Sequence, residues 1–284
     1  MANKMRRARA KTKVSREPVF LRSISLSPPR GTGVGFPFSV PAIRSLEEIR
    51  FRAPVTFFVG ENGSGKSTLL EGLAAATGLP AIGSVHTASD ETLGAQRQLA
   101  SALKLVWNTR THRGFFLRAE DFFGFAKSLS KMRADFERRL TEIDEEYADR
   151  SAMARGLAKG PVGASLADME SRYGVNLDAN SHGQSFFRLF QSRFVPGGLY
   201  LLDEPEAPLS PQSQLGLIAM IKGMLEQNAQ FIIATHSPIL LAFPGAKILS
   251  FDLVPIREVA YEDLEHVSLT RDFLKDPESF LRRL

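Results

Sequence analysis

Short apolar runs alternate with longer amphipathic segments along much of this chain, and the alternation indicates which elements it forms. Four runs are apolar throughout or nearly so: 55–60 (VTFFVG), 199–203 (LYLLD), 230–235 (QFIIAT) and 246–251 (AKILSF). Strands that are buried on both faces have this pattern, because helices cover both sides of a parallel sheet. The segments 66–77 and 211–227 predict helices that connect such strands.

Two more segments predict strands. Residues 19–26 (VFLRSISL) alternate between apolar and polar positions like a half-buried strand, and residues 28–33 (PPRGTG) predict a turn after it. Residues 113–120 (RGFFLRAE) predict a further strand. Together with the four apolar runs, these segments predict an α/β fold in which a mostly parallel sheet is flanked by helices.

A charged helical region lies between the strand at 113–120 and the final third of the chain. Within residues 121–155, two pairs of opposite charge have i,i+4 spacing: Asp135/Arg139 and Glu146/Arg150. Such pairs favour a solvated helix face over a binding surface. Glycines and a proline at 156–164 (GLAKGPVGA) predict a flexible break. We therefore expect one domain over residues 17–284, with an inserted helical subdomain at about 121–195.

Composition places the chain among globular proteins. It has 284 residues, of which 43% are hydrophobic and 24% charged, as in soluble proteins with a sizeable core. There is no cysteine, which excludes disulfides and thiolate metal sites and favours a reducing cytoplasm. No apolar run approaches the roughly 18 residues of a membrane span, and none follows the basic N-terminus as in a secretory signal.

The net positive charge is concentrated in the first 16 residues. This segment contains seven lysines and arginines and no acid: Lys4, Arg6, Arg7, Arg9, Lys11, Lys13 and Arg16. The other 29 basic residues are outnumbered by 31 acids, so the net charge of +5 comes from the tail. Such a tail can bind nucleic acid or anionic surfaces. The alternative is a disordered start without function, since Met5 could also initiate the chain.

The stretch GENGSGKST, residues 60–68, matches G-x-x-x-x-G-K-[ST] between an apolar run and a predicted helix. Glycines let the backbone fold tightly, so that N–H groups point at phosphate oxygens beside the helix N-terminus. Lys66 would contact the β- and γ-phosphates, and the Ser67 hydroxyl would bind Mg²⁺. The residues predicted to bind nucleotide are Gly60, Asn62, Gly63, Ser64, Gly65, Lys66, Ser67 and Thr68.

Two other apolar runs end in polar residues suited to Mg²⁺ and to the phosphates of a nucleotide. LYLLDEP ends in Asp203 and Glu204, and carboxylates at the end of a parallel strand lie beside the phosphate loop. Asp203 would hold Mg²⁺, and Glu204 would act as general base on the attacking water. QFIIATHSP places His236 at the end of a neighbouring strand, where it could reach the γ-phosphate; the alternative is a structural histidine.

The order of these motifs resembles that of ABC-type P-loop ATPases over residues 19–252. The chain has a phosphate loop, then S-x-G-Q at 181–184, D-E-P at 203–205 and T-H-S-P at 235–238. DEPEAPLSP is similar to the D-E-P-E-A-x-L-x-P of the branch that includes SMC, RecF and OLD-type ATPases, whereas transporter cassettes more often read D-E-P-T-S-x-L-D. RGFFLRAEDFF and YEDLEHVSLTRDFL resemble the small stand-alone "predicted ATPase" proteins of that branch.

The resemblance assigns a role to NSHGQ, residues 180–184. It occupies the place of the LSGGQ signature, before an apolar helix, with Asn180 and His182 departing from the pattern. The resemblance implies that Ser181 and the Gly183 backbone contact the γ-phosphate of ATP held by the opposite subunit, and that Gln184 also binds nucleotide. The alternative for Ser181 is a plain helix cap.

Two weaker assignments come from the same resemblance, and the alternative for both is ordinary loop polarity. The loop that offers a glutamine to Mg²⁺ in this family would follow the strand at 113–120, which places Glu120 there as a candidate metal ligand. The usual aspartate after D-E-P corresponds to Ser210. Phe36 and Phe38 are candidates for stacking on adenine.

The resemblance implies a Mg-ATP-dependent enzyme that sandwiches two ATP molecules in a homodimer and drives an effector protein in DNA maintenance or defence. Lys66 and Ser181 are 115 residues apart, and 48 residues follow His236, so we expect neither long coiled-coil arms nor an appended nuclease domain. Two alternatives stay open: the nucleotide-binding subunit of a membrane transporter, and an ATP-dependent scaffold that does not hydrolyse. The D-E-P-E-A form favours the soluble enzyme over the transporter, and Glu204 favours hydrolysis.

Overall fold

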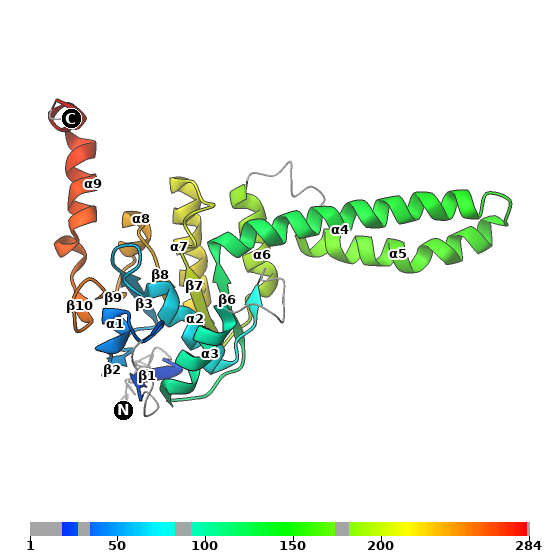
Figure 1. Cartoon of the computed structure of the whole chain (residues 1–284). Helices are drawn as coiled ribbons and strands as arrows, with labels where there is room; N and C mark the ends of the chain where they lie inside the picture. The colour runs from blue at the N-terminus through cyan, green and yellow to red at the C-terminus, as the bar shows by residue number, and fades with distance from the viewer. Residues whose placement is uncertain (1–18, 28–34, 83–91, 174–181, 283–284) are drawn as a thin grey trace, which may run out of the picture.

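A computed structural model describes residues 19–27, 35–82, 92–173 and 182–282 of the chain. The basic tail, the predicted turn at 28–33 and Ser181 therefore lie outside the described residues. The described part contains a central seven-stranded sheet, a small three-stranded sheet and helices around both, as Figure 1 shows.

The central sheet is parallel apart from one edge strand. In spatial order it consists of β10 (Arg257–Val259), β9 (Lys247–Ser250), β3 (Val55–Val59), β8 (Gln230–Ala234), β7 (Leu199–Asp203), β6 (Gly114–Arg118) and β4 (Ala81–Ile82). Only β10 runs antiparallel to its neighbour within this sheet. The predicted mostly parallel α/β sheet is confirmed. β8 lies between β3 and β7. The carboxyl ends of these three parallel strands, where the predicted site residues follow, therefore lie side by side.

The second sheet is antiparallel and packs on the central sheet. It contains β2 (Glu48–Arg50), β1 (Leu21–Leu26) and β5 (Leu103–Trp107). The buried side chain of Gln230 joins the two sheets, since it accepts from the N–H of Leu21 at 2.9 Å and donates to its carbonyl at 3.1 Å. The predicted strand at 19–26 is confirmed as β1.

Helices cover both faces of the central sheet because its strands are apolar on both sides. The helices are α1 (Pro41–Arg44), α2 (Lys66–Thr77), α3 (Thr92–Ala102), α4 (Ala119–Glu146), α5 (Ala152–Tyr173), α6 (His182–Arg193), α7 (Pro211–Glu226), α8 (Pro238–Leu241), α9 (Glu265–Lys275), α10 (Pro277–Leu281) and the 3-10 turn η1 (Tyr261–Asp263). Along β7, Leu199 and Leu201 join the core on the α2 face, whereas Tyr200 and Leu202 join the core on the other face. No helix among the described residues is both long and apolar enough to span a bilayer.

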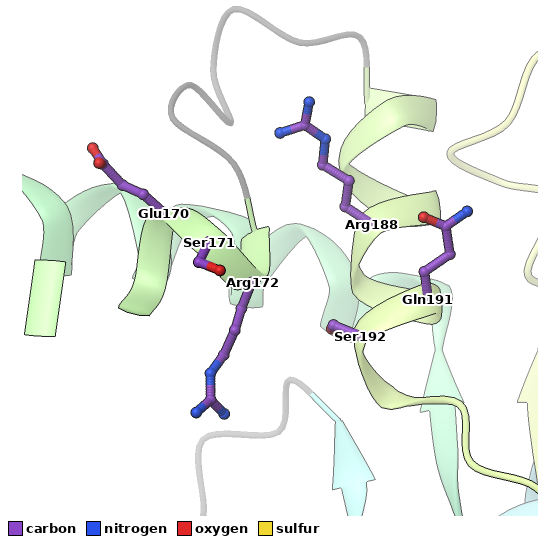
Figure 2. Close-up of a pocket in the computed structure, with 6 residues that line it drawn as sticks. All are labelled: Glu170, Ser171, Arg172, Arg188, Gln191 and Ser192. Atoms are coloured by element: carbon purple, nitrogen blue, oxygen red, sulfur yellow. The ribbon is translucent and has the colours of Figure 1, made fainter. Parts of the chain in front are cut away.

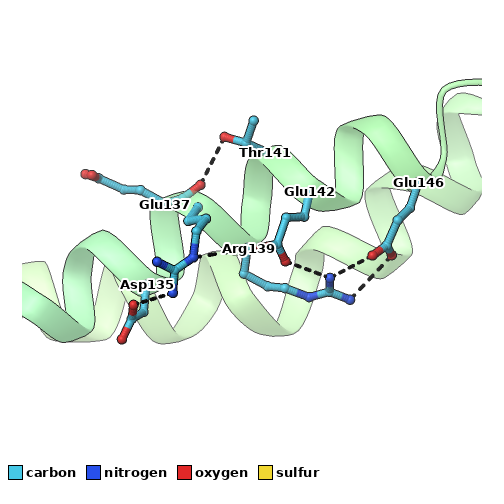
Figure 3. A network of polar contacts seen from close by, with 7 residues as sticks. Asp135, Glu137, Arg139, Thr141, Glu142 and Glu146 are labelled. Atoms are coloured by element: carbon cyan, nitrogen blue, oxygen red, sulfur yellow. Dashed lines mark hydrogen bonds and ion pairs between the residues drawn. The ribbon is translucent and has the colours of Figure 1, made fainter.

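The charged region forms a helical hairpin of α4 and α5 that extends away from the sheet (Figure 1). Its ion pairs differ from the predicted ones. Arg139 pairs with Glu142 at 3.0 Å and Glu146 at 2.9 Å, and Asp135 pairs with Arg138 at 2.6 Å, as Figure 3 shows. Because these side chains are about half exposed, solvent screens the pairs and they add little to stability. The solvated face is confirmed.

The predicted flexible break at 156–164 is wrong, because α5 continues through it with Pro161 inside the helix. The segment lies on the projecting hairpin, where packing against α4 supplies what local propensity lacks. Lys159 pairs with Asp144 of α4 at 2.5 Å, and Met169 further along α5 is buried in the main core. Tertiary contacts therefore override the helix-breaking residues.

Candidate functional site

The backbone between β3 and α2 depends on its glycines. Gly60, Gly63 and Gly65 have φ of 149°, 82° and 103°, conformations that side chains disfavour. A Cβ on Gly65 would also stand 2.8 Å from the Val40 side chain. Asn62 and Gly63 are exposed at the top of the loop, and Ser64 is partly buried with no hydrogen-bond partner for its hydroxyl. The loop is therefore tightly folded and open toward solvent.

Lys66 lies beneath this loop with only 4% of its surface exposed. Its ammonium donates to the carbonyl oxygens of Gly60 at 2.6 Å and Glu61 at 2.9 Å. Burial lowers the pKa of Lys66, and the nearby carboxylates, Glu204 first, counter that effect. A desolvated cation that is held only by neutral carbonyls is available to an anionic ligand.

The start of α2 fits a phosphate group. Gly65 caps the helix in the left-handed conformation and no side chain bonds the first N–H groups, which include those of Ser67 and Thr68. Unpaired N–H groups and the helix dipole attract anions. A left-handed glycine cradle, a buried lysine and an uncapped helix start are features that suit the phosphates of a nucleoside triphosphate.

Asp203 lies where a cation beside those phosphates would be held. The Ser67 hydroxyl donates to Asp203 Oδ1 at 3.1 Å, so the end of β7 meets the first turn of α2. Asp203 is 5% exposed, and burial raises its pKa to about 6, with Ser67 and Arg118 acting in the opposite direction. Within the described residues no cluster of three His, Cys, Asp or Glu forms a metal site. A hydroxyl and one carboxylate suit Mg²⁺, which takes its other ligands from phosphates and water.

Glu204 and His236 face each other across the strand ends. Glu204 has φ of 51°, unusual for a residue with a side chain, and its N–H donates to the carbonyl of Ala234 at 2.9 Å. Its Oε1 lies 3.8 Å from Nε2 of His236, and both side chains are partly exposed. Backbone strain of this kind, about 1–3 kcal/mol, concentrates at functional sites.

The backbone of His236 is fixed by a third acid. Its N–H donates to Glu206 Oε1 at 2.7 Å, and burial raises the pKa of Glu206. Burial, followed by the charge of Lys66, lowers the pKa of His236, so the imidazole is neutral at pH 7. A neutral histidine beside Glu204 can donate or accept a hydrogen bond.

Two residues that the sequence did not single out complete this cluster. Arg118 lies opposite Asp203 in the β6–β7 register and points to the α2 face, where its Nη1 meets Glu71 Oε1 at 2.7 Å. Its Nε is 4.0 Å from Asp203 Oδ2. The alternation of RGFFLRAE could have identified Arg118, because it places this residue on the same face of the strand as Phe116. Glu71 could have been identified because it follows Ser67 by one turn of helix.

The weaker assignments have mixed outcomes. Glu120 is at the first turn of α4, close enough to Arg118 for an ion pair at 3.6 Å, but its side chain is 86% exposed. Phe38 is buried in the core, whereas Phe36 is 59% exposed, so Phe36 is the better candidate for adenine. Ser210 caps α7 by accepting from the N–H of Ser213.

The signature segment is only partly visible. Ser181 lies outside the described residues, as do the side chains of residues 182–184, although α6 begins at His182 as the motif predicts. The roles of Ser181, Gly183 and Gln184 stay predictions.

A hollow of about 530 Å³ lies between the end of α5 and α6, as Figure 2 shows. Its lining residues are Glu170, Ser171, Arg172, Arg188, Gln191 and Ser192. None of them belongs to the cluster around the phosphate loop, so this hollow is separate from the candidate site.

Comparison with known proteins adds a family and a set of similar folds. A family model described as AAA domain matches residues 39–151, and no curated protein matches the chain. A nucleotide-free ATP-binding cassette from an ABC transporter is 16% identical, with 91% of this chain and 96% of that chain covered and a TM-score of 0.44. The Smc head domain from Pyrococcus furiosus, bound to the C-terminal domain of ScpA, is 12% identical, with 89% and 99% covered and a TM-score of 0.43.

The fold and the site are consistent with an ABC-type P-loop ATPase domain. This conclusion depends on the phosphate loop, on Asp203 and Glu204 at the end of β7, and on the AAA-domain match that includes the loop. The segment DEPEAPLSP is consistent with the branch that contains SMC and RecF proteins.

Proposed function

We propose that this protein binds Mg-ATP and hydrolyses it to ADP and phosphate. The observation that carries the proposal is the convergence of Lys66, Asp203, Glu204 and His236 at the ends of three adjacent strands. A phosphate cradle alone would support binding only. The partly exposed carboxylate of Glu204, beside the cradle and opposite a histidine, adds a group that can accept a proton from water.

Each side chain has one task in this mechanism. The loop N–H groups and Lys66 bind the β- and γ-phosphates, and Ser67 and Asp203 hold Mg²⁺. When bound, Mg²⁺ neutralises charge on the phosphate oxygens. Glu204 accepts the proton of the attacking water, and His236 donates its one N–H to the γ-phosphate.

We further propose that ATP brings two copies together, so that Ser181, Gly183 and Gln184 of each copy contact the nucleotide of the other. The position of NSHGQ at the start of α6 supports this, because a serine and free N–H groups at a helix start bind anions. The dimer would drive an effector protein in DNA maintenance or defence, and the basic tail would contact nucleic acid.

Phosphate release tests the catalytic proposal. Glu204→Gln should lower turnover by about 10²–10⁴-fold while ATP still binds, because an amide cannot accept the proton. Glu262→Gln, which changes an exposed acid outside the site, is the matched control and should turn over like the wild type. ATP binding by a wild type that releases no phosphate would instead favour the scaffold.

A further inference from the structure

The segment after β9 lies against the start of the phosphate loop. β9 pairs with β3 in parallel, with Ser250 beside Val59, and the N–H of Phe251 donates to the carbonyl of Val59 at 2.8 Å. Two residues further along both segments, the same register brings Asp252 beside Glu61. None of the roles assigned above uses this segment.

Asp252 bonds the backbone of the loop directly. Its Oδ1 accepts from the N–H of Glu61 at 2.7 Å, the length of a charge-assisted hydrogen bond. The same oxygen is 3.0 Å from the point where a Cβ on Gly60 would stand, and the Cβ of Phe251 is 3.1 Å from it. Gly60 is therefore packed against the segment after β9, and a larger residue would not fit there.

The N–H of Glu61 and the carbonyl of Gly60 belong to one planar peptide group. Asp252 binds the N–H edge of this group, and the ammonium of Lys66 binds its carbonyl edge at 2.6 Å. The two side chains thus hold a single rigid unit from opposite edges. Rotation of this peptide group would break both hydrogen bonds and would displace the carbonyl that positions Lys66.

We propose that Asp252 is a positioning residue for nucleotide binding. It fixes the peptide group between Gly60 and Glu61, and through it the buried ammonium of Lys66, before ATP arrives. This inference rests on the proposed ATP binding but adds a residue that is 191 positions from the loop in the sequence. Because an amide oxygen also accepts a hydrogen bond, but without the charge, asparagine at this position retains part of the role.

Three variants separate this role from a general effect on the fold. Asp252→Ala removes the acceptor, and Asp252→Asn keeps an acceptor oxygen without the charge. Asp263→Ala truncates an exposed acid in the neighbouring 3-10 turn and is the matched control. The probe is a fluorescent ATP analogue, titrated in EDTA and again in Mg²⁺, together with phosphate release at saturating ATP.

Asp252→Ala should raise the Kd by about five- to tenfold in both EDTA and Mg²⁺, the loss expected for one hydrogen bond. Its kcat should stay within about twofold of the wild type, because the catalytic groups are unchanged. Asp252→Asn should lose less affinity than Asp252→Ala, and Asp263→Ala should bind like the wild type. Wild-type affinity in Asp252→Ala, or equal loss in the alanine and asparagine variants, would overturn the proposal.

Amide exchange distinguishes this result from failure of the proposed function. Measured without nucleotide, exchange at Glu61 should be faster in Asp252→Ala than in Asp252→Asn, even if the wild type bound no ATP. Equal exchange in the two variants would refute the positioning role of Asp252. If the alanine variant does not fold, Asp252→Ser, whose side chain is too short to reach this N–H, takes its place with the same expected results.

Discussion

Replacing Lys66 with methionine separates the charge of this residue from its volume. The methionine keeps an apolar stem of similar length beneath the phosphate loop and removes the ammonium. In the free protein the ammonium donates to two carbonyl groups, those of Gly60 and Glu61, at 2.6 and 2.9 Å. Each such bond contributes about 1.5–3 kcal/mol, but burial of the cation opposes them, as the lowered pKa of Lys66 indicates.

The two effects oppose each other in the free protein, whereas in the complex the phosphate charge adds a favourable contribution. We expect the melting temperature of Lys66→Met to lie close to that of the wild type. When ATP binds, a unit charge about 4 Å from a phosphate oxygen contributes about 4 kcal/mol at an effective dielectric constant of about 20. Since about 1.4 kcal/mol is a factor of ten, affinity should fall by about three orders of magnitude.

Titration with a fluorescent ATP analogue in EDTA measures this loss without interference from Mg²⁺. Lys131→Met, which removes an exposed lysine on α4, is the control and should bind like the wild type. Binding by Lys66→Met within about threefold of the wild type would refute the assignment of this loop. A large fall in melting temperature would refute the argument that burial offsets the two hydrogen bonds.

Three further predictions follow from the site and the tail. Burial raises the pKa of Asp203 to about 6, so above pH 6 the ionised carboxylate destabilises the fold, and Asp203→Asn should be more stable by about 2–3 kcal/mol at pH 8. This gain should shrink as pH falls through 6 toward 4; a gain that is constant across thermal melts from pH 4 to 8 would exclude the ionisation of Asp203 as its cause. Glu120→Ala should change the Mg²⁺ concentration for half-maximal turnover by less than about threefold, because its side chain is 86% exposed, and a tenfold rise would establish it as a ligand. Deleting residues 1–16 should leave ATP turnover intact and weaken salt-sensitive nucleic-acid binding in a filter assay, and absence of any such binding by the full chain at low salt would leave the tail without this role.

Local signals were enough to predict the elements around the phosphate loop. The helix expected at 66–77 is α2, and the four apolar runs correspond to β3, β7, β8 and β9. In these segments the hydrophobic pattern, the glycines and the strand ends indicate the same structure. The bond between Ser67 and Asp203 follows from that arrangement, so the central part of the site was predictable from the sequence.

Residues whose role depends on register were not predictable in the same way. Asp252 meets the loop only because β9 pairs with β3, and Arg118 meets Asp203 only because β6 pairs with β7. The sequence does not state which strands are neighbours. The continuous α5 was not predicted for a related reason. Its glycines and Pro161 predict a break, and only packing against α4 overrides them.

The central claim, that ATP is hydrolysed between two copies of this chain, is tested most directly by light scattering of Glu204→Gln with and without Mg-ATP. The variant should bind ATP and hydrolyse it very slowly, so the account predicts that its mass doubles with Mg-ATP and stays that of a monomer without it. Adding Ser181→Arg should restore the monomer, because the arginine blocks the contact with the opposite nucleotide, while each phosphate loop still binds ATP. A Glu204→Gln protein that stays monomeric at saturating Mg-ATP, or a dimer that Ser181→Arg does not affect, would contradict the account.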